Sequence, residues 1–276
     1  RDQLFIKIML KVGIRKKTKE SIAGWVFISP MIVGMLLFLT FPLIFSIVIS
    51  FTNYTIGMDI FGGDYQFIGF ENYRNALYDV FFMQGMINIL ITCAGIPIGL
   101  VISLIITNLL ASNPKFAIIF KAIYYVPTIC GMVAITFIWQ WIYAPMYGLI
   151  NQVLASINIP TVAFVGSKQF FIPSMIVMGI WSGMGTMILL LFASLKAISK
   201  QLYEAASIDG ANFFQKFIHI TIPGLSPTIF YILVTGISGT LQEFTKFQIM
   251  RGGVVSDWSV TPAWWIYNYT IDSAYG

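Results

Sequence analysis

A short polar segment, residues 199–223, lies between two long apolar stretches and carries the residues best suited to recognition chemistry. Glu204 and Asp209 are carboxylates that can accept hydrogen bonds from basic or hydroxyl groups of another molecule. Between them lie two small residues, Ala205 and Ala206. Gly210 adopts backbone conformations that other residues resist, so we expect it to end a helix. The spacing predicts a compact surface on which a partner protein docks.

Capping residues predict two short helices in this segment. Ser199 can cap a helix over 200–208 by accepting a hydrogen bond from a free N–H of its first turn. Asn212 has capping-box spacing for a second helix over 213–219. A helix pair between two apolar stretches could transmit a push from a docked protein to both.

The catalytic motifs that the sequence would need for an enzyme are absent. It has no GxxxxGK[ST] phosphate-binding loop, so we expect no ATP hydrolysis by this chain. The single histidine, His219, has no metal-ligand spacing around it, and no Ser-His-Asp or Cys-His arrangement is available. Cys93 and Cys130 lie in apolar stretches and are expected to be buried free thiols. We therefore predict no catalytic residue, no metal site and no cofactor in the chain itself.

The composition is that of a membrane protein. Hydrophobic residues make up 58% of the 276 positions and charged residues only 10%, whereas soluble domains carry roughly 25% charged residues. The depletion extends over most of the length, which predicts an all-α, polytopic membrane protein in contact with lipid. The net charge of +5 does not indicate a nucleic-acid partner.

The apolar stretches predict five membrane spans after an N-terminal cytoplasmic tail, residues 1–21. The spans lie at about 22–51, 85–110, 117–142, 172–195 and 223–244, and all belong to one transmembrane domain, residues 22–276. Pro223 suits the first turn of the last of these spans. Five spans leave the C-terminus outside, so we expect a sixth span beyond residue 276.

Basic residues are distributed unevenly between the two predicted faces of the membrane. With the N-terminus inside, the cytoplasmic face holds the seven basic residues of positions 1–19 together with Lys115, Lys121, Lys196, Lys200 and Lys216. The outer face holds four, namely Arg74, Lys168, Lys246 and Arg251. Twelve against four is the bias of the positive-inside rule, and it places the segment 199–223 in the cytoplasm.

The segment 199–223 resembles the EAA loop of permease subunits of bacterial ATP-binding-cassette (ABC) importers. That loop reads EAA, three residues, Gly, nine residues, Ile-x-Leu-Pro; here Ile222 replaces the Leu and every spacing agrees. The resemblance implies a type I ABC importer permease fold in the bacterial cytoplasmic membrane. It implies that Glu204, Ala205, Ala206, Asp209 and Gly210 couple the chain to two ATPase subunits, which bind the ATP and Mg. The other implied partners are a second permease, preferably a different chain, and an extracytoplasmic solute-binding protein.

Weaker motifs resemble the carbohydrate branch of these permeases, the maltose and glycerol-phosphate type. They are the FxGxxNY-like segment 67–73, Tyr-Tyr-Val-Pro at 124–127 with Trp139, the G-x-I-N segment 148–151, and Gly252-Gly253, where Val254 replaces a proline. The Ile-Pro that often precedes the coupling helix is Ile198-Ser199 here. The implied cargo is a sugar such as an oligosaccharide, with glycerol phosphate as the alternative.

The resemblance implies a substrate site midway through the membrane, on the spans that flank the EAA-like loop. The residues at those positions are Trp181, Ser182, Gly183, Gly236, Thr240, Gln242 and Glu243. An aromatic face can stack on a sugar ring, and hydroxyl, amide and carboxylate groups can bind sugar hydroxyls. Small residues in membrane helices also serve packing. Glu243 can face a cavity or pair with Lys246 at the membrane interface.

Two other classes of protein remain as alternatives. A secondary transporter or channel without an ATPase would favour an ionisable residue in mid-span as an ion relay, and the first four predicted spans have none in their central portions. A membrane scaffold or assembly factor would need no polar groups converging on a cavity.

Overall fold

The computed structural model describes residues 21–55, 58–59, 62–63, 65–112 and 124–272. The expected cytoplasmic tail therefore lies almost entirely outside the described residues, as does the link between the second and third expected spans. Helices dominate the described part, whose only β pairing is an isolated bridge between Thr52 and Phe67. The chain forms two compact units, Arg1–Asn75 and Ala76–Gly276.

Four helices in the described part are long and apolar enough to cross a membrane: Ser21–Ile49, Val80–Ala111, Lys168–Ala197 and Phe213–Leu241. They confirm four of the five expected spans, with ends shifted by a few residues in the first, second and fourth. The last begins ten residues before the expected position because the second short helix of segment 199–223 runs into it.

The third expected span, 117–142, is broken in its described part. Residues 124–129 are helical, Cys130 lies in a bend, and α7 (Met132–Ile142) begins after Gly131. Gly131 has φ −60° and ψ 139°, an extended conformation that interrupts the helical hydrogen bonds. A hydropathy pattern cannot detect such a break, because the apolar residues continue through it.

In the first unit, the long helix contains a wide turn ahead of a proline. The π-helical residues η1 (Leu36–Thr40) precede α2 (Phe41–Ile49), whose first turn contains Pro42. A proline has no N–H to donate and clashes with the preceding turn, so a local change of helical register accommodates it. None of the helix's most apolar window is buried within the structure.

The FxGxxNY-like segment closes the loop that follows this helix. Gly69 has φ +63°, a conformation that favours glycine. The Asn72 amide, in α3 (Glu71–Tyr78), donates to the carbonyl oxygens of Ser50 and Thr52 at 2.9 and 2.7 Å. Tyr73 Oη lies 2.6 Å from Ser50 Oγ. The two amide bonds satisfy carbonyl groups at the helix end, and the tyrosine adds a hydroxyl contact at the same place, so both motif residues bind the end of the helix.

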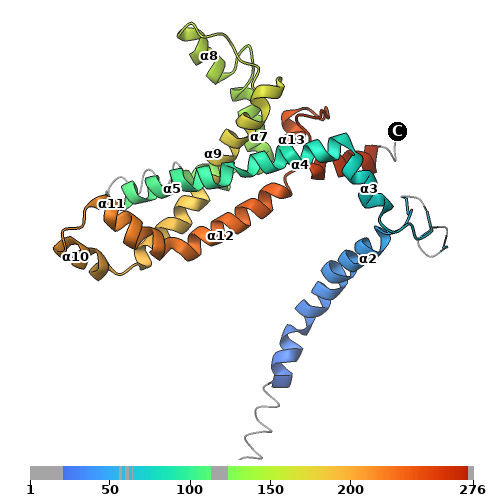
Figure 1. Cartoon of the computed structure of the whole chain (residues 1–276), viewed down its shortest axis with the longest axis horizontal. Helices are drawn as coiled ribbons and strands as arrows, with labels where there is room; N and C mark the ends of the chain where they lie inside the picture. Colours follow the sequence, from blue (N-terminus) through green and yellow to red (C-terminus); the bar gives the residue numbers. More distant parts are fainter. Residues whose placement is uncertain (1–20, 56–57, 60–61, 64, 113–123, 273–276) are drawn as a thin grey trace, which may run out of the picture. The chain divides into compact units, whose positions relative to one another are not determined.

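The second unit is a helical bundle built around α9 (Lys168–Ala197). Figure 1 shows α5 (Gly95–Ser112) and α12 (Ile222–Leu241) running beside it, while α4 (Val80–Cys93) continues the line of α5. Leucine and isoleucine fill the space between them: Leu100, Leu104, Leu191, Leu225 and Ile232 are buried together. Residues 199–223, which we call the docking segment, lie at one end of this bundle and α13 and α14 at the other (Figure 1).

At the end away from the docking segment, the chain folds back after α12 and packs against α4 and α9. The elements α13 (Thr245–Met250), α14 (Pro262–Tyr267) and η3 (Asn268–Asp272) follow each other there. Trp264, Phe171 and Phe247 are almost completely buried in the shared core. The buried Asn88 amide of α4 donates to the carbonyl oxygens of Asp257 and Val260, both at 2.9 Å. This region is therefore held by packing and by hydrogen bonds to its backbone.

The G-x-I-N segment has a comparable structural role before α9. Asn151, in α8 (Leu149–Ser156), is buried and bonds both the N–H and the carbonyl oxygen of Val162, at 2.8 and 3.0 Å. Its amide also donates to the Ala144 carbonyl oxygen at 3.2 Å. A Cβ on Gly148 would collide with backbone atoms of Ala144 and Ile142. Glycine and asparagine are thus both required to close this loop.

Candidate functional site

The docking segment, residues 199–223, begins with the expected helix α10 (Lys200–Ile208). The expected side-chain cap is wrong, because Ser199 occupies the N-cap position without a side-chain hydrogen bond. The Leu202 N–H, one of the groups such a cap would satisfy, donates to the Ser199 carbonyl oxygen at 3.3 Å. The helix end is as expected: Gly210 has φ +77°.

Two backbone hydrogen bonds complete the turn at Gly210. The Gly210 N–H donates to the Ser207 carbonyl oxygen at 3.2 Å and the Ala211 N–H to the Ala206 carbonyl oxygen at 2.9 Å. This is the pattern of a Schellman motif, in which a left-handed residue lets the chain close over the last helical carbonyls. The turn is therefore determined by one residue type at one position.

The second short helix carries the expected capping box. The Gln215 N–H donates to Asn212 Oδ1 at 2.9 Å, and the Asn212 N–H donates to Gln215 Oε1 at 2.8 Å. The helix α11 (Phe213–Lys216) is shorter than expected and continues through the π-helical η2 (Phe217–Thr221) into α12. The wide turn directly precedes Pro223 and accommodates its missing N–H, so no separate helix end forms at His219.

Side-chain contacts hold the two helices of the docking segment together. Tyr203 Oη lies 2.9 Å from Thr221 Oγ1, and Lys216 Nζ donates to Ser207 Oγ at 2.7 Å. Every partner in these bonds belongs to the segment. The shape of the segment is therefore determined by its own residues. Because Thr221 is the N-cap residue of α12, the Tyr203–Thr221 bond also connects α10 to the start of α12.

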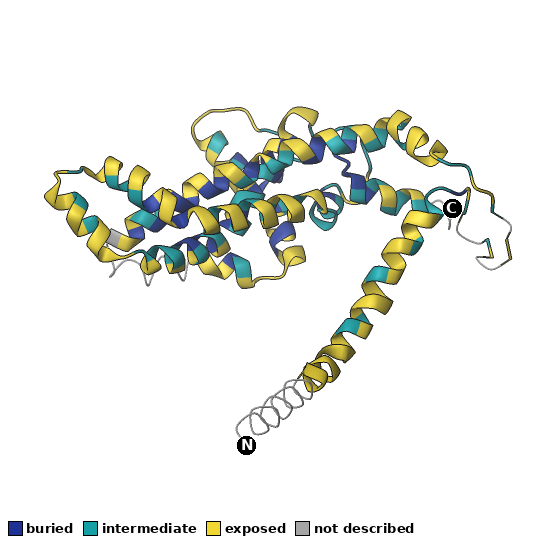
Figure 2. Ribbon diagram, turned by 60° about the horizontal axis from the view of Figure 1, so that its bottom comes forward, coloured by how far each residue is buried: buried dark blue, intermediate teal, exposed yellow. Residues whose placement is uncertain are grey.

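The predicted coupling residues lie at the surface. Glu204, Ala205, Asp209 and Gly210 are exposed, and Ala206 is half-buried. Large apolar side chains are exposed beside them, with Ile208 87% exposed and Phe214 71%. Figure 2 shows this end of the bundle largely exposed. Carboxylates next to exposed apolar side chains form a surface suited to a protein partner.

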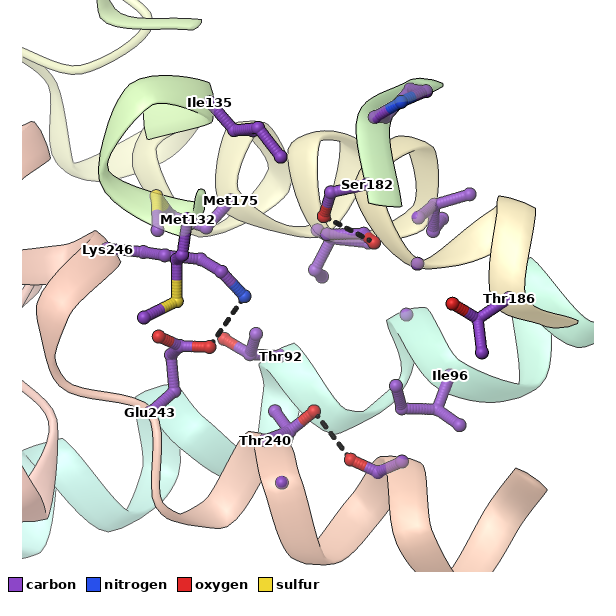
Figure 3. A pocket seen from close by; sticks show the side chains of 18 of the residues that line it. Thr92, Ile96, Met132, Ile135, Met175, Ser182, Thr186, Thr240, Glu243 and Lys246 are labelled. Carbon is purple, nitrogen blue, oxygen red and sulfur yellow. Dashed lines mark hydrogen bonds and ion pairs between the residues drawn. The ribbon is translucent and has the colours of Figure 1, made fainter. Parts of the chain in front are cut away.

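A cavity of about 450 Å³ lies among the helices of the second unit, and we refer to it as the central cavity. Its walls come from the α4–α5 junction, the broken segment around Cys130, α9, α12 and α13. Five of the seven predicted substrate residues line it: Ser182, Gly183, Gly236, Thr240 and Glu243. Figure 3 shows Ser182, Thr240 and Glu243 arranged around the opening. The volume lies in the range of small-ligand sites, roughly 300–1,000 Å³.

The remaining two predicted substrate residues do not line the central cavity. Trp181 packs edge-to-face against Trp139, with ring centroids 5.6 Å apart. Gln242 caps the end of α12 and its amide donates to the Ser238 carbonyl oxygen at 3.1 Å. Each lies next to a lining residue in sequence; Trp181 is turned onto a different face of α9, and Gln242 turns back toward the end of α12.

Several lining residues were not among the predicted substrate residues. They are the hydroxyl and glycine residues Thr92, Gly179, Thr186, Thr235 and Gly239, the cation Lys246, and the thiol of Cys130. Helical spacing was the available signal, since small and hydroxyl residues recur every three or four positions at 179–186 and 235–243. The expectation of a buried thiol is wrong for Cys130, which is exposed at the cavity wall, while Cys93 is half-buried.

The cavity contains one ion pair. Lys246 Nζ lies 2.6 Å from Glu243 Oε2, and the two side chains are 22% and 15% exposed (Figure 3). Glu243 therefore lines the cavity and also forms the expected pair with Lys246. The Thr261 hydroxyl donates to the Glu243 carbonyl oxygen at 2.8 Å and also accepts from the Trp264 N–H. The backbone of Glu243 is thereby tied to the start of α14.

A bundle of apolar helices, with an internal cavity that holds hydroxyl groups and one ion pair and with an exposed EAA-like segment, is the arrangement expected of an ABC importer permease. Residues 89–275 match the family model described as "Binding-protein-dependent transport system inner membrane component". The match covers more than half of the chain, so the protein belongs to this family of transporter membrane components.

Relatives and solved structures agree with the family assignment. The "Probable ABC transporter permease protein YesP" of Bacillus subtilis is 32% identical over 243 residues, covering 87% of this chain and 76% of the relative. The "Arabinooligosaccharides transport system permease protein AraP" of the same species is 29% identical over 237 residues, covering 84% and 72%. A crystal structure of a bacterial alginate ABC transporter, in complex with alginate pentasaccharide-bound periplasmic protein, has a chain of the same fold. Its TM-score is 0.75 at 22% identity, over 94% of this chain and 86% of that one.

Proposed function

We propose that this chain forms half of the translocation pore of an ATP-driven, binding-protein-dependent importer of an oligosaccharide. The observation that carries the proposal is the central cavity, most of whose hydroxyls and glycines come from the two spans that flank the docking segment, and whose ion pair lies just after the second of them. Such a cavity offers hydrogen bonds to a polyhydroxylated solute without a strongly charged wall. The arabino-oligosaccharide relative supports a sugar as cargo.

In this proposal, two separate ATPase subunits bind ATP and Mg and grip the docking segment of this chain and its counterpart on a second, different permease. Glu204, Ala205, Ala206, Asp209 and Gly210 form the contact surface. ATP binding closes the ATPases and opens the pore outward, and hydrolysis resets it. The bond between Tyr203 and Thr221 supports this role, because it links the docking helix directly to the start of α12.

An extracytoplasmic solute-binding protein delivers the sugar to the opposite end of the bundle, where α13 and α14 lie. The periplasmic protein bound to the structural neighbour supports such a partner. The N-terminal tail, residues 1–21, and the docking segment are cytoplasmic, in agreement with the excess of basic residues on that face. Residues 22–276 form the transmembrane domain.

The test is co-purification from native membranes in mild detergent, followed by uptake measurements in proteoliposomes. We expect the wild-type chain to recover an ATPase with a phosphate-binding loop and a second EAA-bearing permease, and to take up oligosaccharide only with ATP inside. Glu204→Lys should lose the ATPase while remaining inserted, because it places a cation where basic partner groups dock. Glu71→Lys is the matched charge reversal at an exposed carboxylate in the first unit, and it should keep the ATPase.

Two results would overturn the proposal. Recovery of the chain without any ATPase, in a detergent that preserves known importers, would favour a self-sufficient transporter. Uptake driven by an ion gradient in the absence of ATP would favour the same conclusion.

A further inference from the structure

The charged groups of the central cavity are confined to one pair. Among the described residues that line it, Glu243 and Lys246 are the only charged side chains, and they lie in contact at 2.6 Å. A second ion pair, Lys168 with Asp257, is longer at 3.6 Å and far more exposed, at 71% and 46%. The cavity therefore presents both signs of charge at one point and no net charge.

The backbone on both sides of the pair is held in place. The Glu243 N–H donates to the Thr240 carbonyl oxygen at 3.0 Å, and its own carbonyl oxygen accepts from Thr261 Oγ1 at 2.8 Å. Lys246 lies in α13, whose Phe247 and Met250 are 1% and 2% exposed in the core that α13 shares with α9 and α14. The main chain that carries both residues is therefore held in place, which favours the paired arrangement.

The contact leaves hydrogen-bonding capacity of both kinds. It uses Oε2 of Glu243 and one ammonium proton of Lys246, which leaves Oε1 as an acceptor and two N–H donors. In the described residues, no other hydrogen bond involves either charged group. One sugar hydroxyl can donate to the carboxylate while its neighbour on the ring accepts from the ammonium. Adjacent hydroxyls supply this complementary arrangement within one rigid ring.

We propose that the Glu243–Lys246 pair determines substrate class, admitting neutral sugars with adjacent hydroxyls and rejecting sugars that carry a carboxylate or phosphate. This inference rests on the proposed function and narrows its cargo. An anionic sugar would enter a partly desolvated cavity in which the one cation is already paired and the nearest charge is a carboxylate. Binding to Lys246 would leave Glu243 unpaired, and a buried charge that loses its partner is strongly destabilising.

The test measures sugar binding directly at the cavity, without the selectivity of a solute-binding protein. Cys130 is exposed at the cavity wall and serves as the reporter. The complete transporter complex is purified in a Cys93→Ser background, and maleimide labelling of Cys130 is followed with maltotriose or with tri-galacturonic acid as protecting sugar. In the wild type, we expect protection by maltotriose at lower concentration than by the acid.

Matched variants separate selectivity from a merely structural role of the pair. We define the protection ratio as the concentration of tri-galacturonic acid that half-protects Cys130 divided by the concentration of maltotriose that does so. Glu243→Gln keeps the shape of the side chain and frees the Lys246 ammonium. The protection ratio should therefore shift in favour of the acid by about tenfold, which corresponds to about 1.4 kcal/mol. Lys246→Gln leaves the carboxylate alone and should shift the ratio further toward the neutral sugar. Asp257→Asn makes the same carboxylate-to-amide change in the ion pair outside the cavity and should leave the ratio unchanged. A pair that only stabilised the turn would weaken both sugars equally.

The outcomes distinguish this inference from the proposed function. The selectivity role would be overturned if tri-galacturonic acid protected Cys130 of the wild type as well as maltotriose or better. An unchanged protection ratio in Glu243→Gln would overturn it too. Either result would still leave a sugar-binding cavity. Absence of protection by either sugar in the wild type would instead contradict the assignment of the cavity as a sugar site, and this inference with it.

Discussion

The docking segment and the central cavity are built in opposite ways. In the docking segment, the glycine turn, the capping box and the Tyr203–Thr221 contact all join residues within one stretch of 199–223. The walls of the cavity come from Thr92 to Phe247, on helices that are distant in sequence. The docking surface can therefore keep its shape while the cavity changes, because only the cavity depends on how the helices pack.

This difference suits the two proposed tasks. A docking surface that transmits force should move as a rigid body, and short-range hydrogen bonds give it that property. A translocation site should open and close, and a site shared among helices changes when one helix shifts against another. Three predictions test the contrast, from the largest expected effect to the smallest.

The first prediction concerns the crossing of α9 with residues 124–129. A Cβ at Gly185 would collide with the Tyr124 carbonyl oxygen, a backbone atom that cannot rotate away. Gly185→Ala should force the helices apart, destabilise the protein by about 1–3 kcal/mol, and abolish uptake by displacing the cavity wall at Pro127 and Thr128. Thermal unfolding of the purified protein in detergent measures the loss.

Gly179→Ala is the matched control for this variant. It makes the same change on the same helix, where no atom lies within 4 Å of the added Cβ. Equal melting temperatures for the two alanine variants would show that the close crossing does not hold the cavity together.

The second prediction fills the cavity without changing helix packing. Gly239 lines the cavity and has no atom within 4 Å of an added Cβ. Gly239→Leu should therefore fold normally and reduce sugar uptake by about tenfold, equivalent to about 1.4 kcal/mol, because its side chain occupies the space of the sugar. Gly239→Ala should have a much smaller effect. Wild-type uptake by the leucine variant would place the translocation path elsewhere.

The third prediction concerns the docking segment alone. Gly210 has open space around it, so a substitution there acts through the backbone at φ +77°. Gly210→Val should introduce about 1 kcal/mol of strain and weaken association with the ATPase about fivefold. Gly210→Asn should remain close to wild type, because asparagine tolerates the left-handed region. The measurement is a titration of ATPase onto the permease in nanodiscs. Similar affinities of the wild type, Gly210→Val and Gly210→Asn for the ATPase would argue that the Gly210 turn does not shape the docking surface.

Sequence reasoning succeeded where one stretch of chain decides the outcome. Hydropathy located four spans, and the identities of Gly210, Asn212 and Gln215 located the turn and the capping box. It failed at Ser199, whose backbone carbonyl oxygen, instead of its side chain, accepts from the Leu202 N–H. It also failed at residues 130–131, because the apolar pattern continues through a break in the helix. The expected helix end at His219 was also wrong, because a π-helical turn joins the segment to α12.

The candidate cavity was predicted only in part. The resemblance to importer permeases was sufficient to place Ser182, Gly183, Gly236, Thr240 and Glu243 on or next to the spans that flank the docking segment. It did not identify Thr92 or Cys130, since their elements reach the cavity only through packing against α9 and α12. Nor did it separate Trp181 from Ser182, because adjacent residues on a helix point about 100° apart and the orientation of the helix about its axis comes from its neighbours.

The sequence by itself determined the membrane class, the positions of most spans, the docking segment and the family. These features depend on composition, on short-range hydrogen bonds and on spacing within one stretch of chain. The tertiary structure alone decided which polar residues share the cavity, that the Glu243–Lys246 pair lies inside it, and that Thr261 holds the Glu243 backbone at the start of α14. The reason is physical: these contacts depend on how each helix is rotated and how closely glycines such as Gly185 let it approach its neighbours, and packing among distant segments sets both.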